Sequence, residues 1–134
     1  MKLLKFVLFF SFIIFTTSCD NEDYLLALEG NWKLDRISGG LGGGGFEVDR
    51  EVTMEIFEDK MVMRADDRRF MRARLSYEKG EYYDSIILEK ENIPNELDFF
   101  LPLFDELGIA LEEDELSLSD LCNDCYQYHF KKEI

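Results

Sequence analysis

The chain has 134 residues, a length typical of one domain. Its 15 Lys and Arg residues against 29 Asp and Glu residues give a net charge of −14. Nucleic-acid binding and electrostatic adhesion to an anionic membrane both need a basic surface, so this charge argues against both. Aromatic and branched apolar residues recur along the whole chain, which predicts a folded core rather than disorder.

The first residues have the three parts of a secretory signal peptide. Lys2 and Lys5 precede the apolar run Phe6–Phe15, and the small residues 16–18 precede Cys19. A membrane-spanning helix is one alternative, but it needs about 20 apolar residues. A buried core helix is another, although no polar residues mark a second face. We predict that residues 1–18 are a signal peptide.

The "TTSC" junction before Cys19 resembles the lipobox of bacterial lipoproteins, in a form without the usual leucine. The resemblance implies cleavage before Cys19 and acylation of that residue, for instance with palmitate. More than one acyl chain gives stable membrane anchoring. The alternative is ordinary cleavage, which would leave Cys19 as a free thiol.

The acidic "DNED" that follows Cys19 resembles the export tag of some surface lipoproteins of Gram-negative bacteria. A solvated tether would look the same. We therefore expect an outer-membrane lipoprotein, with display at the cell surface as the favoured orientation. Residues 19–29 are predicted to be the acylated cysteine and an acidic tether, and residues 30–134 a single domain. Without the two lysines of the signal peptide, the net charge becomes −16.

Short runs with a two-residue alternation of apolar and polar residues predict β-strands across the domain. They are "WKLDRIS" (32–38), "EVTMEIFE" (51–58), "KMVMRAD" (60–66), "FMRARLSYE" (70–78), "YYDSIILEK" (82–90), "ELSLSDL" (115–121) and "YQYHFKK" (126–132). Six to eight strands on short connections indicate one antiparallel sheet that is closed or nearly closed.

The segment 92–115 breaks the alternation. Phe99, Phe100, Leu103, Phe104 and Leu107 would suit one face of a short helix, which Pro102 would interrupt. Alternatively, residues 97–101 form an edge strand that ends at the proline. We expect one strand and one helical turn that covers an open end of the barrel.

"LALEGNWKLDRISGG" resembles the start of lipocalin-like domains, whose first strand begins with Gly-x-Trp, here Gly30, Asn31 and Trp32. "SGGLGGGGFE" and "CYQYHFKKE" resemble small lipocalin-like lipoproteins of Gram-negative bacteria. The resemblance implies an up-and-down barrel of about eight strands, with Trp32 closing its floor and an apolar or amphipathic small ligand inside. The middle of the chain departs from the family pattern, so no ligand residues carry over.

The alternation itself predicts which side chains face inward, and hence which would line a ligand cavity: Trp32, Val52, Met54, Ile56, Met71, Leu75, Tyr77 and Phe130. Small barrels can also be filled by their own side chains. The second hypothesis is therefore a filled barrel that binds a protein or glycan through its outer face. We expect a monomer without a cofactor.

Six glycines fall within residues 39–45, but no Lys-Ser/Thr follows them as a phosphate-binding P-loop requires. The run predicts a mobile connection between the first two strands. Gly42, Gly43, Gly44 and Gly45 could gate the cavity, and a plain flexible connector is the alternative.

Cys122 and Cys125 flank Asn123-Asp124, which predicts a two-residue hairpin turn with the cysteines within reach of a disulfide. Metal binding is the alternative, but tetrahedral zinc needs four ligands and only His129 lies nearby. We predict a disulfide and no metal site.

Five of the seven arginines lie between Arg64 and Arg74. Arginine suits bidentate contact with carboxylates and phosphates, so an anionic glycan, lipid head group or acidic partner could bind there. The alternative is an ion-paired, solvated hairpin. The run Leu111–Glu115 lacks the ligand spacing of a calcium loop. The serines stand in no nucleophile elbow, and His129 is the only histidine, so we predict no enzyme and no catalytic residues.

Overall fold

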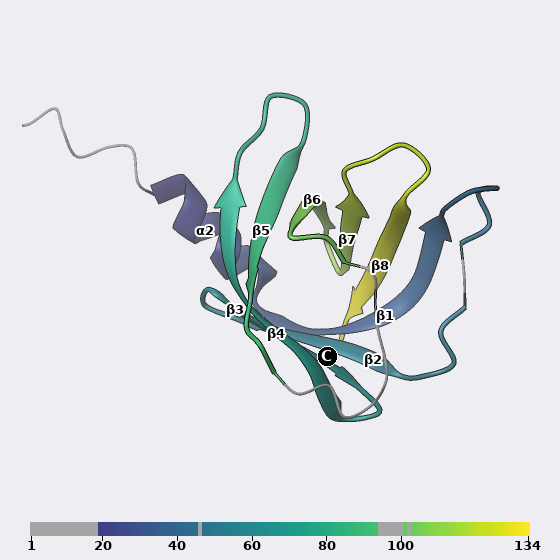
Figure 1. The fold of residues 1–134 in the computed structure, drawn as a ribbon. Helices are drawn as coiled ribbons and strands as arrows, with labels where there is room; N and C mark the ends of the chain where they lie inside the picture. The colour runs from purple at the N-terminus through teal and green to yellow at the C-terminus, as the bar shows by residue number, and fades with distance from the viewer. Residues whose placement is uncertain (1–18, 46, 94–100, 102) are drawn as a thin grey trace, which may run out of the picture.

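The computed structural model describes residues 19–45, 47–93, 101 and 103–134. Within them, one helix precedes eight antiparallel strands that pair in chain order, and β1 pairs with β8 to close a barrel (Figure 1). The elements are α2 (Cys19–Leu28), β1 (Gly30–Gly39), β2 (Val52–Phe57), β3 (Lys60–Ala65), β4 (Arg68–Glu78), β5 (Asp84–Lys90), β6 (Glu106–Glu112), β7 (Glu115–Asp120) and β8 (Tyr126–Lys132). The predicted all-β barrel is confirmed, and its architecture is compatible with a lipocalin-like fold.

The two-residue period of the sequence corresponds to alternating burial along the strands. In β2, Val52, Met54 and Ile56 are buried, whereas Glu55 and Phe57 are exposed. Successive side chains of a strand point to opposite faces, so one set enters the barrel and the other meets solvent. The pattern recurs in β3 and β7.

Two-residue acidic turns set the register of three hairpins. They are Glu58-Asp59 between β2 and β3, Asp66-Asp67 between β3 and β4, and Glu113-Asp114 between β6 and β7. Glu58, both residues of the second turn and Glu113 have positive φ angles between 48° and 64°. That backbone matches the twist of antiparallel strands, and short turns of this kind fix which residues pair.

Two strands contain an extra residue that interrupts the alternation. In β1, Leu34 pairs with Phe130 and Arg36 with His129, so Asp35 has no partner on β8. In β4, the register with β3 shifts beside Phe70. Such β-bulges redirect the side chains that follow. The bulge at Asp35 explains why "WKLDRIS" alternates imperfectly.

A continuous apolar core occupies the barrel. Its largest fully buried side chains are Trp32, Tyr128, Phe130, Leu28, Met54, Met61, Met63, Ile86, Leu107, Leu116, Leu118 and Val52. β4 contributes Leu75, which is 3% exposed. An eight-stranded barrel is just wide enough for its own side chains to fill it.

The helix α2 closes one end of the barrel. Leu28 is fully buried, and its carbonyl accepts a hydrogen bond of 2.9 Å from Trp32 Nε1. Tyr24 stacks on Tyr77 of β4 with ring centroids 4.1 Å apart. The residues expected to form an acidic tether thus form a helix whose C-terminal half packs against the barrel. Its apolar positions Tyr24, Leu25 and Leu28 provide that contact.

The segment 92–115 contains a later strand than the sequence predicts. Leu107 lies in β6, so the expected helical turn through this residue is wrong, because Gly108–Ile109 pair with both β5 and β7. Leu101 and Leu103 are buried against the core. The alternative edge strand at 97–101 falls mainly outside the described residues, as does the signal peptide at 1–18. No helix within the described residues has the length and apolar content of a membrane span.

Candidate functional site

The side chains predicted to line a ligand cavity lie on the inner face of the barrel. Seven of the eight are buried, namely Trp32, Val52, Met54, Ile56, Leu75, Tyr77 and Phe130. Met71 is partly buried and packs against the same core. All of them except Tyr77, which stacks on Tyr24, belong to or pack against one core cluster, and the binding of a ligand by them stays a prediction.

The glycine-rich connection turns back on itself beside β1. Gly45 donates a hydrogen bond of 2.8 Å to the Gly39 carbonyl, and Gly40 donates one of 3.1 Å to the Cys125 carbonyl. A Cβ atom on Gly45, where φ is 68°, would lie 2.1 Å from the Ile37 oxygen. Glycine is thus required at this position by both space and backbone. Whether Gly42 to Gly45 gate anything stays a prediction.

Surface grooves border this connection and the helix. One of about 580 Å³ lies between the Leu34–Ile37 part of β1 and the later residues Gly44, Gly45, Glu47, Val48 and Arg50. It forms because β1 pairs with β2 only through Gly30–Lys33 and then diverges from it. A second groove, of about 410 Å³, places Leu25 and Leu26 of α2 among the carboxylates around the β2–β3 turn.

Cys122 and Cys125 lie at disulfide-bonding distance, with Cα atoms 5.5 Å apart. The predicted two-residue hairpin is wrong, because β7 ends at Asp120 and β8 begins at Tyr126, which leaves a connection of five residues. Asp124 nevertheless takes the left-handed backbone expected of a turn, with φ 63°. Among the described residues, no group of His, Cys, Asp and Glu is arranged to hold a metal ion.

Asp120 is a buried carboxylate at the end of β7, 7% exposed. Its Oδ2 lies 3.5 Å from Tyr128 Oη, and its Oδ1 has no hydrogen-bond partner among the described residues. Burial raises the pKa of Asp120, and the backbone amides of Phe104 and Tyr126 offset part of that rise. Burial, together with the neighbouring carboxylate, also raises the pKa of Tyr128.

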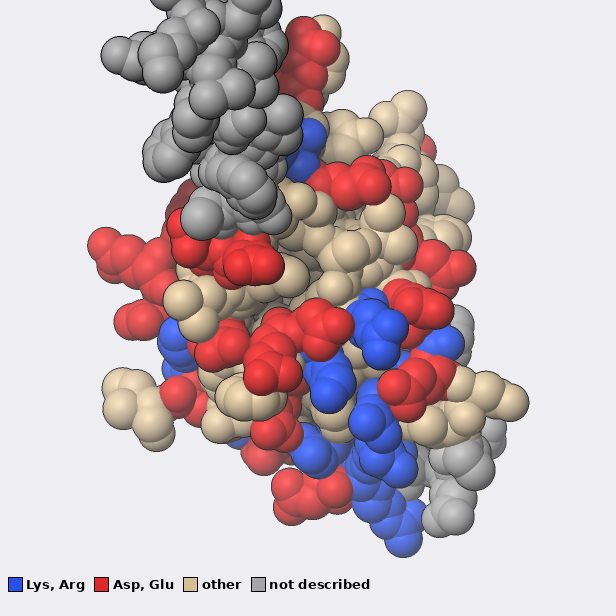
Figure 2. Space-filling model, turned by 90° about the vertical axis from the view of Figure 1, so that its left-hand side faces the viewer, with Lys and Arg blue, Asp and Glu red and all other residues tan. Residues whose placement is uncertain are grey.

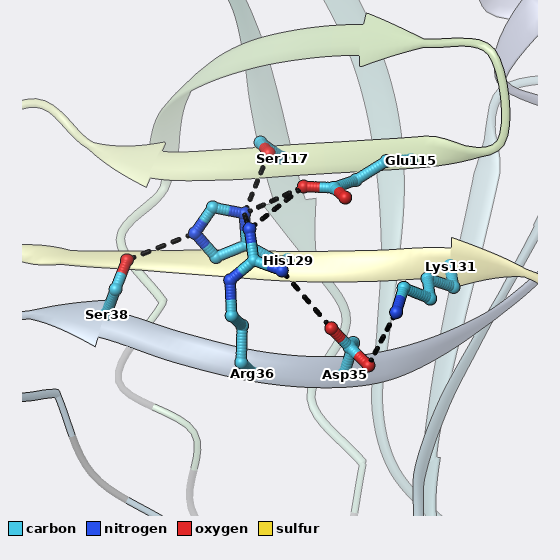
Figure 3. Close-up of polar contacts among 7 residues, drawn as sticks. All are labelled: Asp35, Arg36, Ser38, Glu115, Ser117, His129 and Lys131. Atoms are coloured by element: carbon cyan, nitrogen blue, oxygen red, sulfur yellow. Dashed lines mark hydrogen bonds and ion pairs between the residues drawn. The ribbon is translucent and has the colours of Figure 1, made fainter.

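A polar cluster covers the outer face where β1, β8 and β7 run side by side (Figure 3). Its members are Asp35, Arg36, Ser38, Glu115, Ser117, His129 and Lys131. At its centre, His129 is 8% exposed because neighbouring side chains cover it. The Ser38 hydroxyl lies 3.0 Å from His129 Nε2, and Glu115 Oε1 lies 3.2 Å from Nδ1.

The same cluster continues into a chain of ion pairs. Arg36 contacts Glu115 and Asp35, each at 3.2 Å, and Lys131 contacts Asp35 at 3.0 Å. The hydrogen bond from Lys131, with a further contribution from Arg36, lowers the pKa of Asp35. The bulge at Asp35 therefore places its carboxylate between two cations.

Ser38, His129 and Glu115 have the order of a hydroxyl–imidazole–carboxylate relay. However, Arg36 lies 3.2 Å from both His129 Nδ1 and Glu115 Oε1. A guanidinium at this position neutralises the carboxylate that would stabilise an imidazolium, so it opposes general-base chemistry. The arrangement is better suited to joining three strands than to activating the Ser38 hydroxyl.

The arginines of β3 and β4 form a cationic column on another part of the outer face. We use this name for Lys60, Arg64, Arg69, Arg72 and Arg74. Lys60 lies directly opposite Arg74, and Arg64 directly opposite Arg69. Figure 2 shows Lys and Arg gathered in a band with Asp and Glu at its margins.

Acidic residues flank the cationic column but do not divide it. Arg64 pairs with Glu55 at 3.0 Å, Arg72 with Glu91 at 3.3 Å, and Arg74 with Asp59 at 3.4 Å. Those carboxylates belong to β2, to the residue after β5 and to the β2–β3 turn. The predicted ion pairs are thus present for three of the arginines, at the edges of the column.

Sequence reasoning identified the arginines but missed the cluster around His129 and the buried Asp120. The relevant signal was the polar set Ser117, Gln127 and His129 on alternate positions of the last two strands. To predict the cluster from these residues, one must also know that β1 pairs with β8, although the two strands are about 90 residues apart in the chain. No protein-family model, curated protein or solved structure matches the chain.

Proposed function

We propose that the protein is a non-enzymatic, lipid-anchored binding module of the cell envelope, whose barrel is a rigid scaffold that presents its outer wall to a macromolecular partner. The observation that carries this proposal is the continuous core. Bulky side chains such as Trp32, Tyr128 and Phe130 meet inside the barrel and are fully buried. Interior space that side chains occupy is not available to a ligand.

The position of the anchor supports the same proposal. Cys19, the predicted acylation site, is the first residue of α2, and Leu28 at the other end is buried in the barrel. A ten-residue helix is about 15 Å long, so acylation at Cys19 would hold the barrel close to the membrane. Its outer wall would then meet envelope components or the exterior.

Native mass spectrometry of the acylated protein, purified from a Gram-negative host in mild non-ionic detergent, tests whether the barrel is filled by its own side chains. We expect the mass of the polypeptide with its acyl groups and no further small molecule. A stoichiometric apolar compound that leaves on mild activation would overturn the proposal and favour a lipocalin-like carrier.

Metabolic labelling with a palmitate analogue tests the anchor. We expect label on the wild type and none on Cys19→Ser. Protease treatment of intact cells then reports the exposed face, since a surface protein is cleaved while the cells remain whole. Label on both variants would contradict acylation at Cys19.

A further inference from the structure

We propose that the cationic column binds a linear anionic polysaccharide, with carboxylate or sulfate groups in contact with its arginines. This inference rests on the proposed function, because it assigns the partner of the outer wall. It starts from an arrangement that is unfavourable for stability alone. Like charges that face each other across two strands destabilise a sheet, and β3 and β4 contain two such pairs on one face, on either side of the Val62–Arg72 pair.

Acidic residues are available that could stand opposite these cations in place of like charges. The chain contains 29 acidic residues, and it places a carboxylate opposite a column arginine on the next strand, where Glu89 of β5 faces Arg74. Between β3 and β4, however, each outward position from Lys60 to Arg64 faces a cation. An anion bound along the column would remove this repulsion, so the charge pattern favours a ligand.

The cations remain accessible. The side chains of Arg64, Arg72 and Arg74 are 36%, 39% and 64% exposed. Arg69 is exposed and has no ion-pair partner among the described residues. An arginine has five N–H donors in a planar fork, so a single carboxylate contact leaves others free for a ligand.

The shape of the column favours a narrow, linear partner. Two adjacent strands are about 5 Å apart, so the column is only two side chains wide. Glu55 and Glu91 border it on either side. A flat anionic membrane would bring its charges against those acids as well, whereas a single polyanionic chain would contact only the cations.

Two further observations favour a polysaccharide over an acidic peptide. β3 and β4 pair on both edges, so neither offers backbone groups for the strand addition that extended peptides commonly use. Phe57, opposite Lys60 on β2, is 60% exposed, and Val62 lies between the cations on β3. These apolar groups can pack against the C–H faces of sugar rings while the arginines hold the acidic groups.

Fluorescence anisotropy with the full chain in non-ionic detergent tests the inference. The probes are end-labelled oligogalacturonate, which is carboxylated, and a heparin-derived oligosaccharide, which is sulfated. Neutral maltohexaose, polyglutamate and vesicles with anionic lipid serve as comparisons. We expect at least one anionic oligosaccharide to bind, with affinity that falls as NaCl is raised.

The decisive comparison uses two triple variants that remove the same charge. Arg64→Gln/Arg72→Gln/Arg74→Gln alters the column, and Lys33→Gln/Arg36→Gln/Lys131→Gln removes three ion-paired cations elsewhere. We expect the first to weaken binding at least about tenfold, since charge-assisted hydrogen bonds are lost, and the second to change it less than about twofold. Arg74→Gln alone gives an intermediate loss with little risk to folding.

Equal loss in both triples would overturn the inference, because net charge would then suffice. Failure of both anionic oligosaccharides would overturn it too, and column-dependent binding of polyglutamate or vesicles alone would assign the site to another partner class. None of these results would contradict the proposal that side chains fill the barrel. Conversely, an apolar ligand found by mass spectrometry would remove the proposed function without changing the oligosaccharide result.

Discussion

Two cation-bearing walls of one barrel hold their charges in opposite ways. On the wall formed by β1, β8 and β7, Arg36 lies between Asp35 and Glu115, and His129 has hydrogen-bond partners at both ring nitrogens. On the wall formed by β3 and β4, cations face cations, and the balancing acids lie at the margins. On the first wall the polar side chains bond to one another. On the second wall the arginines keep N–H donors that a bound partner could use.

The difference between the two walls follows from how far apart in the sequence their paired strands are. β3 and β4 are consecutive, and a two-residue turn already fixes their register. β1 and β8 come from opposite ends of the domain, so no short turn fixes their register. Cross-strand polar contacts on that wall help to specify which residues pair. The comparison suggests that local connection frees a wall for function, whereas distant pairing requires it for structure.

His129 is central to the structural role of the first wall, so its loss should cost the most stability. His129→Ala removes the centre of a covered polar cluster and leaves Ser38 and Glu115 without that partner. We expect a loss of about 2–3 kcal/mol in the free energy of unfolding, measured by urea titration. Gln127→Ala, on the same face of β8, is the control and should cost under about 0.5 kcal/mol. Equal losses would show that the cluster does not stabilise the seam.

A smaller effect contrasts the two triple variants in stability rather than binding. Replacing Lys33, Arg36 and Lys131 by Gln should lower the free energy of unfolding by less than His129→Ala does, because the ion pairs that are lost, including the contact with Glu115, are exposed to solvent. The triple variant of the cationic column should lose less, since it also relieves repulsion. Thermal denaturation at low ionic strength measures both. A larger loss in the column variant would reverse the comparison.

Reversing one charge of the cationic column isolates the contribution of a single cross-strand pair. Arg69→Glu places a carboxylate directly opposite Arg64 and should raise the free energy of unfolding by about 0.2–1 kcal/mol at low salt. Arg68→Glu changes the charge equally but faces Ala65, so it is the matched control. The gain should shrink as NaCl is added. A similar gain in both variants would indicate a general effect of charge instead of the cross-strand pair.

Asp120 lies on β7 but is buried, so it belongs to neither outer wall, and its contribution should be small. Because burial raises the pKa of Asp120 above the ordinary value, the folded protein binds its proton at a higher pH than the unfolded chain does. Asp120 should therefore make stability fall as pH rises from about 3.8 through the raised pKa, and then level off. Asp120→Asn should remove that slope in urea titrations at a series of pH values.

Tyr128→Phe refines the test of Asp120. The tyrosine hydroxyl opposes the rise in the pKa of Asp120, so its removal should extend the sloping range to higher pH. An unchanged slope in Asp120→Asn would mean that other groups cause the pH dependence.

Local pattern predicted the parts of this fold that depend on neighbours in sequence. The alternation in Val52–Phe57 predicted the inner and outer faces of β2. The outward direction of Arg72 and Arg74 followed from the same period. The two-residue period is a property of a single strand. These side-chain directions could therefore be predicted without knowing which strands pair.

The parts that depend on distant pairing could not be predicted in that way. The bulge at Asp35 is defined by its register with β8, and the burial of His129 requires side chains from three strands. The first half of the helix α2 has an acidic composition typical of a tether, and Leu28 at its other end is buried because the barrel end covers it. In each case the deciding contact lies elsewhere in the chain.

The pairing of β1 with β8 also has a kinetic consequence. The barrel closes only when Leu34 meets Phe130, and bringing such distant segments together costs loop entropy before any contact forms. Until that moment the edges of β1 and β8 both have free backbone groups, which can pair with another chain. Folding of such topologies takes about milliseconds to seconds. A chaperone or a dilute environment would therefore protect these two edges from pairing with another chain before the barrel closes.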